Sequence, residues 1–316
     1  MSNLTILYIL TLTSALIAGA KNVLIKRMFI AKAHEHVIGF WTNLGVAFIC
    51  YAGGIYIYGI PDIRPGFWLP FFITAFLNIF IIYLGHMKAM KFEDASITAP
   101  LGTVSPVIVI LTAYIIVGQI PTFWGKIGIV LFALGTYVLQ LKGAEVQLPN
   151  WMLAVLPAKI QPQVVFFLGP WLRIAKSKGA RLALFGALLS AVSINYDWLA
   201  IKQTDPLFFT ASGFLVVALA VLIKSVISGE WQEIPAEKKA QSTKALAIGI
   251  FWGVGCGLTN TAFWYGIVPY VSSLRRSQIL FTVILAYFFL KQERGFIAIR
   301  LIAAAIITAG AILIAF

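Results

Sequence analysis

Long apolar stretches alternate with short polar stretches along almost the whole chain. A helix that crosses a bilayer needs roughly 20 mostly apolar residues, and the apolar stretches reach that length at ten places. They predict membrane-spanning helices at residues 4–26, 37–59, 67–87, 95–117, 121–141, 182–202, 206–228, 244–266, 270–290 and 296–316. The expected fold class is therefore an all-α integral membrane protein.

The ten expected spans form two sets of five that align with each other. The matched positions are Ser14-Ala15 with Ser190-Ala191, Ala113-Tyr114 with Ala286-Tyr287, Gln119 with Gln292, and Gly135 with Gly310. An odd number of spans in each set inverts the second copy in the membrane, a plan common among transporters. We therefore expect a first five-helix repeat at 1–142, a linker at 143–180 and a second repeat at 181–316.

The basic residues predict the orientation of the chain. Its net charge is +13, although only 11% of its residues are charged. The loops after the odd-numbered spans hold 18 of the Lys and Arg residues, and the opposite loops hold three, Arg64, Lys126 and Lys202. Loops rich in Lys and Arg stay in the cytoplasm, so we expect both termini on the non-cytoplasmic side of a cell (inner) membrane. This asymmetry accounts for the positive charge without a nucleic-acid partner.

The linker carries two apolar pieces, WMLAVLP and VVFFLGPWLRIA, that are too short to span. Pro157, Pro162 and Pro170 are expected to break them, and basic residues follow. This composition is typical of segments that lie on a membrane surface, although an ordinary surface linker has a similar composition.

Two adjacent arginines, Arg275 and Arg276, fall inside the expected ninth span. A charged side chain in a span persists where it pairs, faces a wet cavity or extends to the interface. The planar guanidinium group suits phosphate or carboxylate. We interpret the pair as an anion clamp for a substrate; extension to the outer headgroups is the alternative.

Lys21 and Asp197 lie at equivalent depths in the first and sixth spans. The Lys21 stem is long enough to reach the interface, but a Lys21–Asp197 ion pair would reduce the cost of burying both charges. We expect such a pair, with a role in coupling or gating.

The eighth span carries glycines at four-residue spacing, Gly249, Gly253 and Gly257, and Asn260 and Trp264 continue the same face. Small residues at this interval let helices approach closely, whereas an amide in lipid needs a polar partner. Asn260 is therefore expected to bind either a neighbouring helix or the substrate.

With Asn260 and Trp264, two further residues complete the expected binding wall: Tyr265 and, in the third span, Asn78. The aromatic rings could stack on a ligand, although aromatic side chains near span ends are also typical interfacial anchors. No spacing of Cys and His fits a zinc site, and neither GxSxG nor HExxH is present. We therefore expect no catalytic residues, metal or cofactor.

The polar turns before the fifth and tenth spans, VGQIPT at 117–122 and LKQERG at 290–295, support a resemblance to a known family. The chain resembles the drug/metabolite transporter superfamily with two EamA-type five-helix repeats. Members usually carry a Glu in this turn; Gln119 replaces it in the first repeat, and Glu293 remains in the second. The resemblance implies a central cavity, with the fifth and tenth helices packed at the periphery.

The Arg275-Arg276 pair is also similar to a Lys-Arg pair on the ninth helix of the triose-phosphate translocator branch, where it binds phosphate. That branch uses a further Lys on its fourth helix, but span 95–117 has no Lys or Arg. We expect a secondary transporter that moves a small polar, anionic or zwitterionic metabolite by alternating access, with lipids as its other partners. The alternatives are an exporter of organic cations that uses Asp197 and, in a different class, an enzyme acting on lipid-linked substrates.

Overall fold

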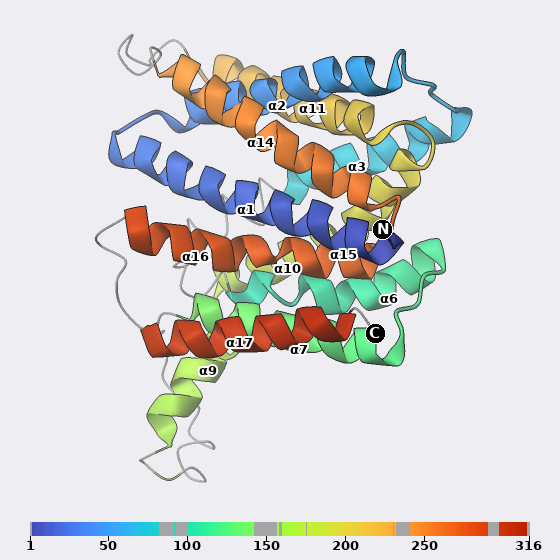
Figure 1. Cartoon of the computed structure of the whole chain (residues 1–316). Helices are drawn as coiled ribbons and strands as arrows, with labels where there is room; N and C mark the ends of the chain where they lie inside the picture. The colour runs from blue at the N-terminus through green and yellow to red at the C-terminus, as the bar shows by residue number, and fades with distance from the viewer. Residues whose placement is uncertain are drawn as a thin grey trace. The chain divides into compact units, whose positions relative to one another are not determined.

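The computed structural model describes residues 2–81, 92, 100–141, 157, 160–174, 176–229, 231, 241–289 and 297–314. These residues form helices and connecting turns (Figure 1). Within them, seven helices are long and apolar enough to cross a membrane, and Pro65–Phe80 and Ile302–Ile314 are shorter apolar helices. The described part of the chain is thus that of a helical, multi-pass membrane protein.

The contacts divide the chain into two compact units. Unit 1 comprises Met1–Phe76 and Ile194–Gly295, and unit 2 comprises Leu77–Ser193 and Phe296–Phe316. This division differs in kind from the expected repeats at 1–142 and 181–316, because each unit takes helices from both repeats. The repeats are units of sequence, whereas these two units are units of packing.

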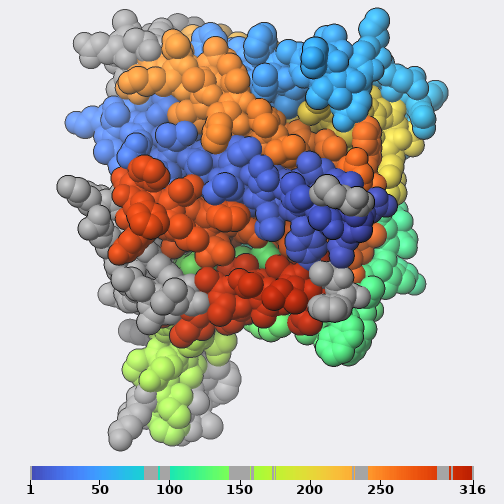
Figure 2. Space-filling view, in the orientation of Figure 1, coloured from blue at the N-terminus to red at the C-terminus, as the bar shows by residue number. Residues whose placement is uncertain are grey.

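Unit 1 contains most of the helices. They are α1 (Asn3–Ile30), α2 (Glu35–Tyr58), the short η1 (Pro65–Phe67), the first part of α3 (Trp68–Phe80), the end of α10 (Lys178–Ile201), α11 (Pro206–Ile227), α14 (Ser242–Ala262), α15 (Val268–Arg275) and α16 (Ser277–Phe289). Helix α1 packs between α14 and α16, and α2 packs on α11 and α14 (Figure 1). On the face shown in Figure 2, α1 fills the space between α14 and α16 without a gap.

Unit 2 is built around one helix pair. Helix α7 (Phe123–Gln140) lies against α17 (Ile297–Ile314), and α6 (Ser105–Val117) packs on α7. A Cβ added to Gly128 would lie 2.6 Å from the carbonyl oxygen of Gly310, and one added to Gly310 would lie 2.7 Å from that of Gly128. The two backbones therefore touch at a contact that only glycine permits.

Local sequence fixes several helix ends. Asp205 caps α11, because its Oδ1 accepts a hydrogen bond from the Phe208 amide at 2.7 Å. Thr122 caps α7 in the same way, through the Gly125 amide at 3.0 Å. Gly59 follows the last residue of α2 and Gly118 that of α6, and both have a positive φ, a conformation that costs glycine little.

The glycines of the eighth span let α14 approach α2. A Cβ on Gly249 would collide with the backbone carbonyl of Thr42, and one on Gly253 with the Ile49 side chain. On the other side of this contact, a Cβ on Gly45 would lie 2.5 Å from the Leu246 carbonyl oxygen. The interpretation of this stripe as a close helix contact is confirmed for Gly249 and Gly253, whereas Gly257 faces the Leu207 side chain of α11.

The expected ninth span, 270–290, is not one uninterrupted helix. It divides into α15 and α16 at Arg276, whose amide donates to the Ser273 carbonyl at 2.9 Å while the Ile279 amide donates to the Arg276 carbonyl at 3.0 Å. The hydroxyls of Ser272 and Ser273 both donate to the Pro269 carbonyl. Such side-chain bonds to the backbone compete with the helical pattern and bend helices.

The fourth span has a similar turn at the aligned position. There the Thr103 amide donates to the Pro100 carbonyl at 3.1 Å, as Arg276 does to Ser273. Pro106 lacks an N–H, so the Gly102 carbonyl has no helical donor and the helix restarts at Ser105.

The second piece of the linker forms helix α9 (Gln161–Ile174), which continues through both Pro162 and Pro170. The expectation that these prolines break the piece is wrong. Pro162 lies in the first turn, where the amide needs no partner, and Pro170 removes one helical bond without ending the helix. At 14 residues, α9 is too short to span a bilayer, as expected. Apart from Pro157, the WMLAVLP piece lies outside the described residues.

Candidate functional site

Unit 1 gathers charged side chains on several of its helices. Arg275 is the last residue of α15, and Arg276 follows in the turn before α16. Both are partly buried, and Arg275 lies near enough to Lys21 of α1 and Asp197 of α10 for their charges to interact. The carbonyls at a helix C-terminus carry partial negative charge and favour cations, so the end of α15 is a suitable place for the two arginines. We call Lys21, Asp197, Arg275 and Arg276 the interior cluster.

Lys21 and Asp197 do not form the expected ion pair with each other. The Lys21 ammonium lies 4.2 Å from the centroid of the Trp252 ring on α14, a cation–π contact. Asp197 instead accepts a hydrogen bond from the Thr74 hydroxyl of α3. Lys21 of α1 is thus paired with α14, and Asp197 of α10 with α3. The alignment of the two repeats did not predict either partner.

Asn260 binds a neighbouring helix. Its amide donates to the Thr210 hydroxyl of α11 at 2.7 Å, so the side chain has a polar partner on an adjacent helix. Similar bonds join α1 to α14, between Ser14 and Thr259, and α1 to α16, from Asn22 to Thr282 at 3.1 Å. Polar side chains thus bridge helices throughout the interior of unit 1.

The other expected binding residues lie in different places. Trp264 follows the end of α14 and is partly exposed, and Tyr265 beside it is partly buried. Asn78 is partly buried and lies on α3 four residues after Thr74, in the part of that helix that belongs to unit 2. Trp264 joins a pocket at the helix ends, which we call the end pocket, rather than the interior cluster.

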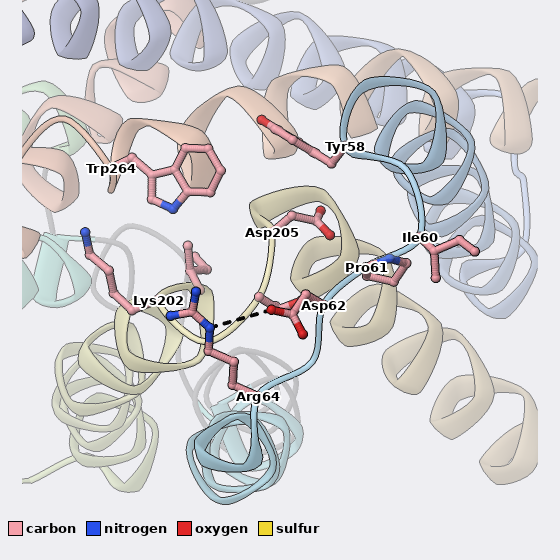
Figure 3. Close-up of a pocket in the computed structure, with 10 residues that line it drawn as sticks. Tyr58, Ile60, Pro61, Asp62, Arg64, Lys202, Asp205 and Trp264 are labelled. Carbon is pink, nitrogen blue, oxygen red and sulfur yellow. Dashed lines mark ion pairs between the residues drawn. The ribbon is translucent and has the colours of Figure 1, made fainter.

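The end pocket has a volume of about 310 Å³, and all its residues belong to unit 1. It is lined by Tyr58, Ile60, Pro61, Asp62, Arg64, Ile201, Lys202, Thr204, Asp205 and Trp264. Figure 3 shows Tyr58 and Trp264 along one side, Asp62 and Arg64 along the opposite side, and Asp205 between them. The pocket thus holds two carboxylates, two cations and two aromatic rings.

Apart from Trp264, the lining of this pocket was not predicted from the sequence, because it comes from loops and helix ends that are far apart in the chain. One signal was present. Only three basic residues lie on the predicted outer side of the chain, and two of them, Arg64 and Lys202, line this pocket.

A multi-pass helical bundle with charged side chains held in its interior is typical of membrane proteins that bind or conduct polar solutes. The sequence matches the EamA-like transporter family over residues 5–141 and 177–316, so the chain belongs to this family, within the drug/metabolite transporter superfamily. Membership in a transporter family agrees with the expectation that the chain is not an enzyme.

The fold also matches a solved structure, described only as the crystal structure of a protein. The two chains are 14% identical with a TM-score of 0.69, and the match covers 97% of this chain and 96% of the other. At this identity the likeness concerns the fold alone. No curated protein matches the chain.

Proposed function

We propose that the chain is a secondary active transporter that moves a small anionic or zwitterionic metabolite across the cell membrane. The observation that carries this proposal is the position of Arg275 and Arg276, at the turn between α15 and α16. In transporters, interrupted helices form substrate sites near the middle of the bilayer. Two guanidinium groups at such an interruption offer donors to a carboxylate or phosphate.

We further propose a ten-helix plan of two inverted five-helix repeats that work by alternating access. The support is the pair of turns at Thr103 and Arg276, which lie at aligned positions and use the same short-range backbone bond. Inverted repeats with corresponding interrupted helices are common in secondary transporters, where one repeat rocks against the other to give alternating access. Such rocking exposes the substrate to each side of the membrane in turn.

Flux into proteoliposomes tests this function. Purified protein would be assayed with three labelled solutes of similar size, a carboxylate, a zwitterion and an amine. We expect flux of the carboxylate or the zwitterion that exceeds empty liposomes and saturates with concentration. Flux of the amine alone would favour a cation exporter that uses Asp197, and no flux with any solute class would contradict transport of small polar metabolites.

The orientation is a separate proposal. The end pocket and the loops that form it would face the non-cytoplasmic side, together with both termini, because the basic loops stay in the cytoplasm. A reporter enzyme that works only in the cytoplasm, fused after Phe316, is expected to be inactive. The same reporter placed in the 229–242 loop should be active, and the reverse pattern would overturn the orientation.

A further inference from the structure

The end pocket is separate in composition from the interior cluster, because none of the four cluster residues lines it. Its volume of about 310 Å³ lies at the lower end of the range for small-molecule sites.

The two cations of the pocket retain capacity to bind an anion. Arg64 makes an ion pair with Asp62 through Nε at 3.7 Å, and both side chains are largely exposed. Exposed ion pairs of this kind contribute little to stability, so Asp62 holds the Arg64 guanidinium only weakly. The Lys202 ammonium lies 5.3 Å from the centroid of the Trp198 ring, and within the described residues it has no carboxylate partner. Both cations line the same pocket, so a ligand carboxylate there has two candidate partners.

The opposite side of the pocket suits a cation. The rings of Tyr58 and Trp264 meet edge to face, with centroids 5.7 Å apart. Aromatic rings arranged around a small space attract ammonium groups. Asp205 lies beside them, and its Oδ1 caps α11, so its second oxygen can accept a hydrogen bond from a ligand.

The walls of the pocket are held in place before any ligand arrives. The Arg64 amide donates to the Gln203 carbonyl at 3.1 Å, which ties the loop after α2 to the loop before α11. Gly66 continues this contact, because a Cβ there would lie 3.2 Å from the Gln203 side chain. The pocket lining also includes Thr204. Within the described residues, the buried hydroxyl oxygen of Thr204 has no hydrogen-bond partner. Because the two loops are already joined, a ligand has less backbone order to impose when it binds.

We propose that the end pocket binds a small zwitterion, with its carboxylate between Lys202 and Arg64 and its ammonium between Asp205 and the rings of Tyr58 and Trp264. If the proposed function and orientation hold, this pocket is a first binding site on the outer side of the transport route. Binding itself depends on neither, so failure of one proposal does not entail failure of the other.

Equilibrium binding to purified protein in nanodiscs tests this proposal, with three probes of one carbon skeleton: norleucine, its amide norleucinamide, and hexanoate. Norleucine carries both charges, whereas the other two carry one each. We expect norleucine to bind at least about tenfold more tightly than either, because each lost charge removes a charge-assisted hydrogen bond.

Two variants identify the pocket as the site. Lys202→Met should weaken norleucine binding about tenfold and leave norleucinamide unaffected, while Asp205→Asn should weaken both amines and still cap α11, since Asn caps about as well as Asp. Lys126→Met is the matched control, because Lys126 is the remaining basic residue of the predicted outer side, is exposed, and lies outside the pocket. Equal binding of all three probes, or unchanged norleucine affinity in both pocket variants, would overturn the proposal.

Discussion

Replacing Arg275 with alanine is expected to lower the flux of an anionic or zwitterionic substrate by about 10- to 100-fold. A hydrogen bond to a charged group contributes about 1.5–3 kcal/mol, and each 1.4 kcal/mol is a factor of ten in affinity. Arg275 lies within electrostatic reach of Lys21 and Asp197, so its loss also leaves Asp197 with less compensating charge. Initial rates in proteoliposomes, at substrate concentrations below saturation, measure the effect.

Arg275→Lys separates charge from shape. Lysine keeps the positive charge but lacks the planar fork, so we expect flux between those of the wild-type and alanine proteins. Lys126→Ala controls for loss of a basic residue elsewhere and should transport normally. If Arg275→Ala transports the anion at the wild-type rate, the arginine does not bind the substrate; if it loses anion flux but keeps amine flux, the anion-binding role gains support.

Gly249→Ala is expected to destabilise the protein by about 3 kcal/mol, the upper part of the usual range for an overpacked site. The added Cβ would collide with the backbone carbonyl of Thr42, which cannot rotate away as a side chain could. Helices α2 and α14 must therefore separate, which loosens the Asn260–Thr210 bond and the other contacts of α14. Thermal unfolding in detergent, followed by size-exclusion chromatography, measures the change.

Gly213→Ala is the matched control, since Gly213 lies within α11 and a Cβ there would meet nothing within 4 Å. Alanine is favoured over glycine in helices by about 1 kcal/mol, so this variant should be as stable as the wild type or slightly more so. Equal thermal stability of Gly249→Ala and the wild type would show that α2 and α14 do not lie at the separation described.

Hydropathy and residue spacing predicted the helical membrane fold and the close contact at Gly249, because both depend on local composition. Charge partners were harder to predict. A span that is apolar on all sides does not reveal how it is rotated about its axis, so Lys21 could not be assigned to Trp252, nor Asp197 to Thr74. The end pocket depends on loops brought together by tertiary structure, and its aspartates and cations each look like ordinary loop residues. The turn at Arg276 does have a local signal in the sequence, because Pro269, Ser272 and Ser273 precede it and both serine hydroxyls donate to the Pro269 carbonyl.

The glycine contact between α7 and α17 has a consequence for biosynthesis. Helix α7 is synthesised long before α17. The face of α7 that carries Gly128 and Gly135 therefore lies in the bilayer without α17 during that interval. A Cβ added to Gly135 would lie 2.9 Å from the Ile307 amide nitrogen. The backbones of α7 and α17 are therefore so close that another span is a poor substitute for α17. Folding of unit 2 is therefore completed after translation of α17, and until then the nascent chain presents an open groove to the insertion machinery.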